Sequence, residues 1–259
     1  MTAMAPGGGS PMKRPIRLAL VTAALVFSAA SSSSAQSAGD GYMFHRPDVT
    51  VSVRGGYSHA AAGSDVFDDV TTNLTLDRGD FSSLTIGGDF AVHLTSRVDV
   101  VLSGGYSRAN HKSEFRDFID NNDLPIEQTT TFERIPLTAN VRLNLSAPGR
   151  AVGRLAWIPT RVVPYVGAGI GAMRYRFKQD GDFVNFTTNA VFPADLDSEG
   201  WGLVEQGMAG VDYNFSTQFG LSLDARYLHA NGELGSAFKG YDRIDLSGAT
   251  ATIGLLVRL

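Results

Sequence analysis

The stretch from Ile135 to Leu145, IPLTANVRLNL, alternates apolar and polar side chains over eleven residues. Successive side chains of a β-strand point to opposite faces, so the alternation predicts a strand with one apolar face and one face that carries Arg142. Strands of soluble proteins are usually about 5–6 residues long, whereas about 9–11 residues are needed to cross a bilayer at a tilt. The length therefore indicates a strand that crosses a membrane.

The same alternation recurs along the rest of the chain. It is found in seven further segments: 48–58, 83–94, 98–107, 163–177, 205–215, 219–229 and 247–259. Short turns connect some of these segments, at 95–97 and 216–218, and a longer connection covers Ser146 to Val162. The other four connections are long and polar, at about 60–80, 110–126, 178–200 and 231–242. Short turns at one end and long loops at the other are typical of outer-membrane barrels.

We therefore predict an all-β fold, an eight-stranded antiparallel up-and-down transmembrane β-barrel preceded by a cleavable signal peptide. Closure removes the strand edges that lipid could not satisfy. The competing fold is a soluble exported β-sandwich or lipocalin-like barrel, in which the apolar face would be the interior. Strand length, charges on one face only and the unequal loop lengths favour the membrane barrel.

The N-terminal residues have the features of a secretory signal. Basic residues at Lys13, Arg14 and Arg17 precede a short apolar run, and the small residues Ser33 and Ala35 suit a cleavage site. Met12 is a second possible start of the chain. The predicted organisation is a signal peptide over 1–35, a short periplasmic segment over 36–48 and the barrel domain over 49–259.

In such a barrel the apolar faces meet lipid, and the polar faces fill a narrow lumen. Buried charges must be paired, and the polar faces carry both signs. The predicted lumen ion-pair residues are Arg54, Asp89, His93, Arg142, Glu205, Asp212, Asp224, Arg226 and Arg258. In the segment 163–177 we expect Tyr165, Met173, Tyr175 and Phe177 to face lipid, opposite Arg174 and Arg176. The predicted aromatic girdle consists of Tyr57, Tyr106, Tyr175 and Tyr227.

Three segments carry a resemblance to a known family. IPLTANVRLNL, VPYVGAGIGAMRYRF and EQGMAGVDYNFSTQFGLSLDARYLH resemble segments of the OmpA-like family of eight-stranded outer-membrane barrels, and the likeness covers Val49 to Leu259. It implies an outer-membrane location in a Gram-negative-type envelope. The expected partners are outer-membrane lipid and lipopolysaccharide, the barrel-assembly machinery and an unknown extracellular ligand. The last residue is Leu259, where many members end in phenylalanine. The resemblance is to the barrel alone, so it does not imply the peptidoglycan-binding domain or the cell-wall tethering of full-length members.

One segment raises the question of catalysis. ARYLHANGELGS, from Ala225 to Ser236, is similar to the segment of lipid A deacylases that holds a histidine and a serine. His229 matches the base, but Ala230 and Asn231 stand where the serine is expected. Covalent acyl transfer needs a nucleophile beside its base. We therefore predict that the chain is not an enzyme.

Other constellations give weaker signals. The chain has no cysteine, which excludes thiol chemistry and cysteine metal sites. Rim histidines could hold zinc and the acidic first loop could hold calcium, but neither set matches a ligand motif. These residues are His59, His111 and His229, and Asp65, Asp68, Asp69, Asp77 and Asp80. We expect no metal, no cofactor and no nucleic-acid partner.

Two functions follow from this fold, and a third is weaker. The first is a structural or surface-interaction role in envelope integrity and loop-mediated contacts. The alternative is a narrow channel for small or hydrophobic solutes, and the weaker one is lipid A modification. An uninterrupted ion-pair network in the lumen would favour the first function. A gap lined by small residues, such as Gly56, Gly87, Gly105 and Ala168, would favour the channel.

Overall fold

The chain divides into two units, Met1–Gly39 and Asp40–Leu259. The computed structural model describes residues 42–43, 45–119, 123–153, 156–185, 188 and 190–259, all in the second unit. The predicted signal peptide and most of the predicted periplasmic segment therefore lie outside the described residues.

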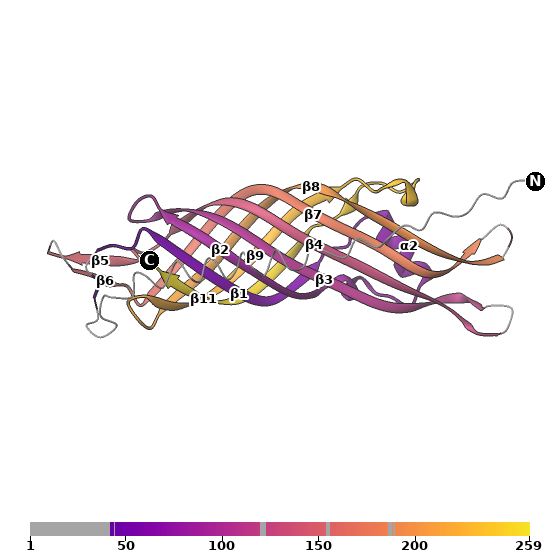
Figure 1. Cartoon of the computed structure of the whole chain (residues 1–259), viewed down its shortest axis with the longest axis horizontal. Helices are drawn as coiled ribbons and strands as arrows, with labels where there is room; N and C mark the ends of the chain where they lie inside the picture. The colour runs from indigo at the N-terminus through magenta and orange to yellow at the C-terminus, as the bar shows by residue number, and fades with distance from the viewer. Residues whose placement is uncertain (1–41, 44, 120–122, 154–155, 186–187, 189) are drawn as a thin grey trace, which may run out of the picture. The chain divides into compact units, whose positions relative to one another are not determined.

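Eight long strands form the closed barrel that the alternation predicts (Figure 1). In chain order they are β1 (Val49–Ala60), β2 (Ser83–His93), β3 (Val98–Ile119), β4 (Pro125–Asn144), β7 (Val162–Asn185), β8 (Ala190–Asn214), β9 (Phe219–Gly232) and β11 (Gly248–Arg258). Neighbouring strands are antiparallel, and the pairing of β11 with β1 closes the ring. The predicted fold class is confirmed.

The register sets the tilt of the strands. A row of paired residues starts at Val49 and passes once round the ring through Val92, Val100, Val141, Ala168, Gly207, Tyr227 and Ala249. The row returns to β1 at His59, ten residues beyond its start. A stagger of this size requires strands inclined by about 35–45° to the barrel axis. A strand at this tilt needs about 9–11 residues to cross a bilayer, and each of the eight ring strands has at least 11.

The two ends of the barrel differ. One end has short turns and a small hairpin of β5 (Gly149–Val152) and β6 (Ala156–Pro159). The other end holds α2 (Asp65–Asn73), the 3₁₀ turns η2 (Arg78–Phe81) and η3 (Ser236–Phe238), and the short β10 (Ile244–Asp245). Among the described residues, none of the helices has the length and apolar character to span a membrane.

Two of the predicted long loops are mostly strand. The pairing of β3 with β4 continues through Glu114 and Glu127, and β7 pairs with β8 as far as Asn185 and Ala190. The segments 110–126 and 178–200 were expected to be loops because they are polar. Beyond the apolar band the outer face of a strand meets water, so polar residues are compatible with continued pairing. These two extended hairpins project from the end of the barrel that holds α2 (Figure 1). We call this end the long-hairpin end.

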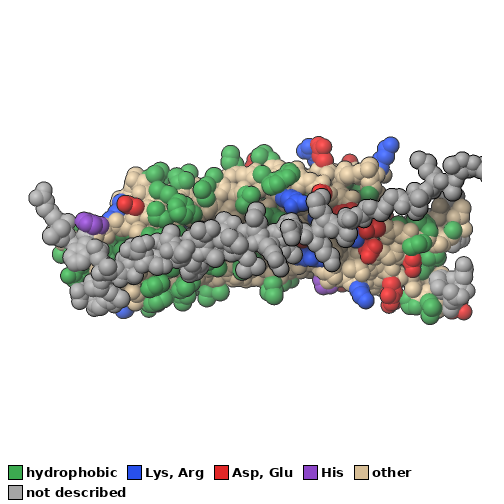
Figure 2. All heavy atoms as spheres, viewed as in Figure 1, with side chains coloured by type: hydrophobic (Ala, Val, Ile, Leu, Met, Phe, Trp, Pro, Cys, Tyr) green, Lys and Arg blue, Asp and Glu red, His purple; other side chains and the backbone are tan. Residues whose placement is uncertain are grey.

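The outward face of the barrel carries an apolar band. Figure 2 shows hydrophobic side chains over the middle of the molecule and charged ones gathered toward the long-hairpin end. Exposed residues of the band include Leu84, Ile86, Leu102, Leu137, Val141, Leu203, Leu223 and Ile253. Large apolar side chains in this number are exposed on a barrel that meets lipid.

On β7 the predicted faces are inverted. Tyr165, Met173, Tyr175 and Phe177 are buried inside, whereas Arg174 and Arg176 are exposed. The outward face of the membrane-level part is formed by Val166, Ala168 and Ile170. Small glycines occupy the inward positions between them, so the apolar alternation is present but on the opposite phase from the one predicted.

An aromatic cluster closes the barrel at the long-hairpin end. Phe67 of α2 lies with its ring centroid 4.6 Å from that of Phe81, 5.3 Å from Phe132 and 5.5 Å from Phe177. Phe238 of η3 contacts Phe177 at 5.3 Å. All five are buried, and we call them the aromatic plug. Apolar packing thus replaces polar pairing in this part of the interior.

Candidate functional site: the barrel interior and the outer wall

One network of buried charges surrounds Asp89 of β2. Its carboxylate accepts hydrogen bonds from Arg54 Nε at 3.1 Å and from Arg226 Nη2 at 3.0 Å. Arg226 also pairs with Asp224, and its Nη1 donates to Ser103 Oγ at 3.0 Å. Because β1, β2, β3 and β9 all contribute, these contacts connect strands that are not neighbours in the ring. Each charge has an opposite partner, as burial requires.

A second network surrounds Arg142 of β4. Its guanidinium pairs with Asp212 of β8 and lies 3.5 Å from Asp99 Oδ2. The guanidinium also lies over the Tyr165 ring, 3.9 Å from the centroid, where a cation–π attraction adds to the pair. Asp99 bonds His93 Nδ1 at 2.6 Å. Asp99 is absent from the predicted ion-pair residues, although its place on the polar face of the 98–107 alternation was the signal that could have found it.

Two further arginines in the interior have no carboxylate partner within salt-bridge distance among the described residues. Arg258 donates through Nη2 to Asn214, and its Nη1 has no hydrogen-bond partner. Arg134 was not predicted as a lumen residue. It donates through Nη1 to the carbonyls of Leu246 and Ser247, at 3.2 and 3.3 Å, and through Nη2 to Ser58 Oγ. Carbonyl oxygens thus replace a carboxylate at the boundary with the aromatic plug.

The interior between these networks is filled. Two cavities of about 30 Å³ each lie there, one beside Arg142 and Tyr165 and the other beside Arg54 and Arg134. A volume of this size holds about one water molecule. The side chains of the two networks line the first cavity, and Arg134 and Met173, next to the aromatic plug, line the second.

Three of the four small residues that could have lined a channel do not do so. A Cβ atom at Gly56 would lie 2.1 Å from the carbonyl oxygen of Ala251, and one at Gly87 would lie 2.6 Å from that of Gly104. These glycines allow close backbone approach. Ala168 faces outward. The gap that would favour a channel is therefore absent at Gly56, Gly87 and Ala168, whereas Gly105 lines the cavity of about 30 Å³ beside Arg54 and Arg134.

Three of the four predicted girdle tyrosines lie on the outer surface. Tyr57, Tyr106 and Tyr227 are exposed. Tyr175 is only 1% exposed and points inward, where its hydroxyl donates to the carbonyl of Glu233. The prediction for Tyr175 is wrong because β7 presents its odd-numbered residues to the interior.

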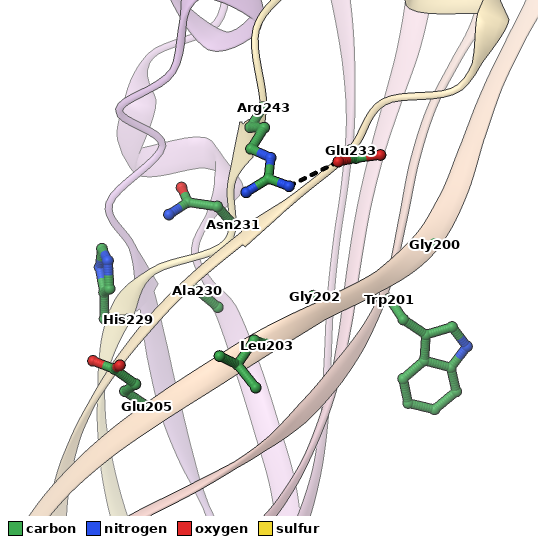
Figure 3. Close-up of a pocket in the computed structure, with 10 residues that line it drawn as sticks. All are labelled: Gly200, Trp201, Gly202, Leu203, Glu205, His229, Ala230, Asn231, Glu233 and Arg243. Atoms are coloured by element: carbon green, nitrogen blue, oxygen red, sulfur yellow. Dashed lines mark hydrogen bonds and ion pairs between the residues drawn. The ribbon is translucent and has the colours of Figure 1, made fainter.

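Glu205 also departs from its predicted place in the lumen. It is exposed on the outward face of β8, directly across from His229 of β9 in the register. Figure 3 shows the two side chains near each other on neighbouring strands, with the Arg243–Glu233 ion pair farther toward the end of β9. The phase of the alternation places Glu205 on the face of Ala209 and Val211, and this signal was overlooked.

The structure brings a serine to His229 that the sequence did not place there. Ser247 Oγ lies 3.3 Å from His229 Nδ1. Ser247 is only 4% exposed, and its Oγ also bonds the backbone N–H and carbonyl of Ala230, at 3.2 and 3.3 Å. A hydroxyl held in this way connects strand ends and is not presented to a substrate. The described residues contain no group of three or more His, Asp and Glu side chains arranged to hold a metal.

A closed barrel with an apolar outer band and paired charges inside is a transmembrane β-barrel. Residues 20–258 match the family model described as outer membrane protein beta-barrel domain, and the chain belongs to this family. It is accordingly a protein of the outer membrane. By the layout of such barrels, the short-turn end is periplasmic and the long-hairpin end is extracellular.

Several solved outer-membrane barrels are similar to the chain. OprG from Pseudomonas aeruginosa is 17% identical, with 84% of this chain and 99% of that one covered and a TM-score of 0.44. Neisserial surface protein A is 11% identical, with coverages of 85% and 98% and a TM-score of 0.43. E. coli outer membrane protein W is 17% identical, with coverages of 83% and 100% and a TM-score of 0.39. No curated protein sequence matches the chain.

Proposed function

We propose that the chain is a structural outer-membrane barrel that supports envelope integrity and holds a rigid extracellular surface for contact with its surroundings. The observation that carries this proposal is the filled interior. The Asp89 and Arg142 networks and the aromatic plug follow one another along the barrel, and two cavities of about 30 Å³ separate them. Paired buried charges resist separation, because breaking a pair leaves a buried charge without its partner.

The extracellular surface in question is the crown, which we define as the described parts of residues 108–133 and 174–201. Its β7–β8 hairpin carries a ladder of ion pairs on the outer face, with Arg174 bonded to Glu199 and Lys178 to Asp195, both at 2.9 Å. Arg176 pairs with Asp197 between them. Strand pairing and the plug fix the shape of the crown, which suits it to present a constant surface to a partner.

Single-channel recording in planar bilayers tests the filled interior. The wild-type barrel is expected to give no resolved openings. Arg226→Ala removes the side chain that connects Asp89 to Asp224, and it should raise the frequency of brief openings. Arg174→Ala, which removes an exposed pair on the outer face, is the matched control and should stay silent. Stable openings of the wild-type chain would favour the narrow channel instead.

A trimmed crown separates the two parts of the proposal. Phe177 pairs with Ser198 in the register, so residues 178–197 can be replaced by an Asn-Gly turn, which suits a two-residue hairpin. In cells that lack the protein, both the full and the trimmed chain should restore exclusion of a hydrophobic dye. Only the full chain should restore adhesion of the cells to surfaces. Loss of dye exclusion with a correctly folded trimmed chain would contradict the structural role of the barrel.

A further inference from the structure

The crown and the helical elements next to it line a cavity that the proposed function does not use. Its volume is about 160 Å³, and it lies between residues of β3, β4, β7 and β8 and residues of α2, η3 and the segment that follows η3. Much of its lining is apolar, including Leu74, Phe115, Phe183, Leu196 and Phe238. An apolar cavity of about 150 Å³ holds a molecule the size of benzene. The cavity is therefore large enough for a small ring.

One part of the cavity wall is buried, and another part meets solvent. Gln128 and Phe238 are only 2% and 3% exposed. Asp69, Ala237 and Tyr241 also line the cavity, and all three are exposed at the long-hairpin end. Because this end is extracellular, we place the entrance of the cavity beside these three residues. A small molecule from the outside would reach the cavity without crossing the barrel.

Gln128 supplies an unused hydrogen-bond acceptor in the buried part of the cavity wall. Its Nε2 donates to the backbone carbonyl of Asp182 at 2.8 Å. Since a carbonyl oxygen only accepts, this bond fixes the orientation of the side-chain amide and leaves Oε1 as its other end. Oε1 is buried and has no hydrogen-bond partner among the described residues. A buried acceptor without a donor is unfavourable, so a ligand that donates to Oε1 would be stabilised.

The carboxylate at the entrance is already occupied. Asp69 Oδ2 accepts from the hydroxyl of Tyr241 at 2.7 Å, and Oδ1 accepts from Asn73 Nδ2 at 2.9 Å. Of the described residues that line the cavity, Asp69 is the one that carries a charge. Its negative charge disfavours an anionic ligand, and its two oxygens already have donors. These features favour a neutral, largely apolar ligand.

We propose that this cavity binds a small neutral aromatic molecule that has the size of phenol and carries one hydrogen-bond donor. The donor bonds Gln128 Oε1, and the ring packs against the aromatic side chains of Phe115, Phe183 and Phe238, which favour contact with another ring. The crown is then a receptor for a small molecule from the extracellular solution as well as a rigid surface. The binding does not require the ligand to pass through the barrel.

Nuclear magnetic resonance of the isotope-labelled barrel in lipid nanodiscs tests the proposal. The probes are phenol and toluene, which have nearly the same shape although toluene has no donor. Both are titrated, and their free aqueous concentrations are corrected for uptake by empty nanodiscs. Phenol should shift the side-chain amide resonance of Gln128 and the backbone resonances around the cavity, and these shifts should saturate.

The ratio of the two dissociation constants isolates the hydrogen bond to Gln128. Gln128→Leu removes the acceptor and keeps an apolar wall, so the ratio should change roughly tenfold in favour of toluene. The cost of removing each probe from water is the same in both proteins and cancels from this comparison. Glu127→Leu, at the neighbouring exposed position of β4, is the matched control and should leave the ratio unchanged.

A second variant tests the cavity without altering Gln128. Ala237→Phe places a ring at the exposed entrance and should weaken the binding of both probes, and it decides the question if Gln128→Leu fails to fold. Three results would overturn the proposal. They are an unchanged ratio in a folded Gln128→Leu barrel, undiminished binding in Ala237→Phe, and phenol-induced shifts that lie only outside the cavity.

Discussion

Arg142 of β4 and Asp212 of β8 are joined across the interior by an ion pair, although β7 lies between their strands in the ring. The contact passes over the face of Tyr165, which β7 contributes. Asp212 is one of the acidic residues that the polar faces placed in the lumen. A pair of this kind links strands that share no backbone hydrogen bonds, so it braces the cross-section of the barrel.

Replacing Arg142 with methionine should lower the free energy of unfolding by about 3–5 kcal/mol, because it leaves buried carboxylates without a cation. Urea titration of the protein folded into lipid vesicles measures this loss. Arg174→Met breaks an exposed pair with Glu199 and should cost about 0–1 kcal/mol. A loss for Arg142→Met as small as for the control would mean that water enters the network freely.

Placing arginine on the lipid-facing wall should also destabilise the barrel. Val141 is 57% exposed within the apolar band, so Val141→Arg should cost about 2–4 kcal/mol if it lies near the midplane. Val152 of β5 is similarly exposed but belongs to the short hairpin outside the ring. Val152→Arg should therefore be close to neutral in the same vesicle titration. Equal costs would show that the apolar band does not meet lipid.

The aromatic plug should stabilise the extracellular half of the barrel. Phe67 is fully buried among aromatic rings, and Phe67→Ala should cost about 3–5 kcal/mol. Hydrogen exchange should show faster exchange in α2 and in the adjoining parts of β4 and β7. Phe192→Ala, at an exposed ring on β8, should leave those segments protected. Unchanged exchange in Phe67→Ala would mean that α2 does not depend on the plug.

Tyr241, in the segment between η3 and β10, should ionise only in strongly alkaline solution. Burial raises the pKa of its phenol, and the hydrogen bond that its hydroxyl donates to Asp69 at 2.7 Å raises the pKa further. The neutral phenol therefore stabilises the folded state below the unfolded pKa of about 10, and this contribution is lost as the pH rises through the higher folded pKa. The absorbance difference at 295 nm between wild type and Tyr241→Phe should titrate above that of N-acetyltyrosine amide. Coincident titrations would contradict the contact with Asp69.

The alternation of apolar and polar residues predicted all eight strands of the ring and the faces of most of them. It was wrong on β7. The alternation of Tyr175 with Arg174 and Arg176 predicted a tyrosine toward lipid and arginines toward the lumen, and the structure has the opposite. The reason is a change of surroundings along one strand. At membrane level the outside is apolar and the inside polar, whereas in the crown Phe177 is inside and charged residues meet water.

The partners of the interior charges could not be assigned from the sequence. The residue that Arg142 meets depends on the ten-residue stagger of the whole ring. This stagger is the sum of the offsets in eight strand pairings, and the sequence of a single strand does not specify it. Contacts made by backbone carbonyls, such as those that hold Arg134, leave no signal in the side-chain pattern. Glu205 was different, because its phase on β8 was readable from Ala209 and Val211.

The stagger also limits how sequences of this kind can change in length. One residue inserted within β4 would turn every following side chain of that strand to the other face and place Arg142 in lipid. The closure between Val49 and His59 would be altered as well. Residues added in pairs at a hairpin tip, beyond Asn185 for example, disturb neither. Length variation among descendants of this chain should therefore accumulate in the crown, so that the part exposed to the outside diversifies while the ring keeps its residue count.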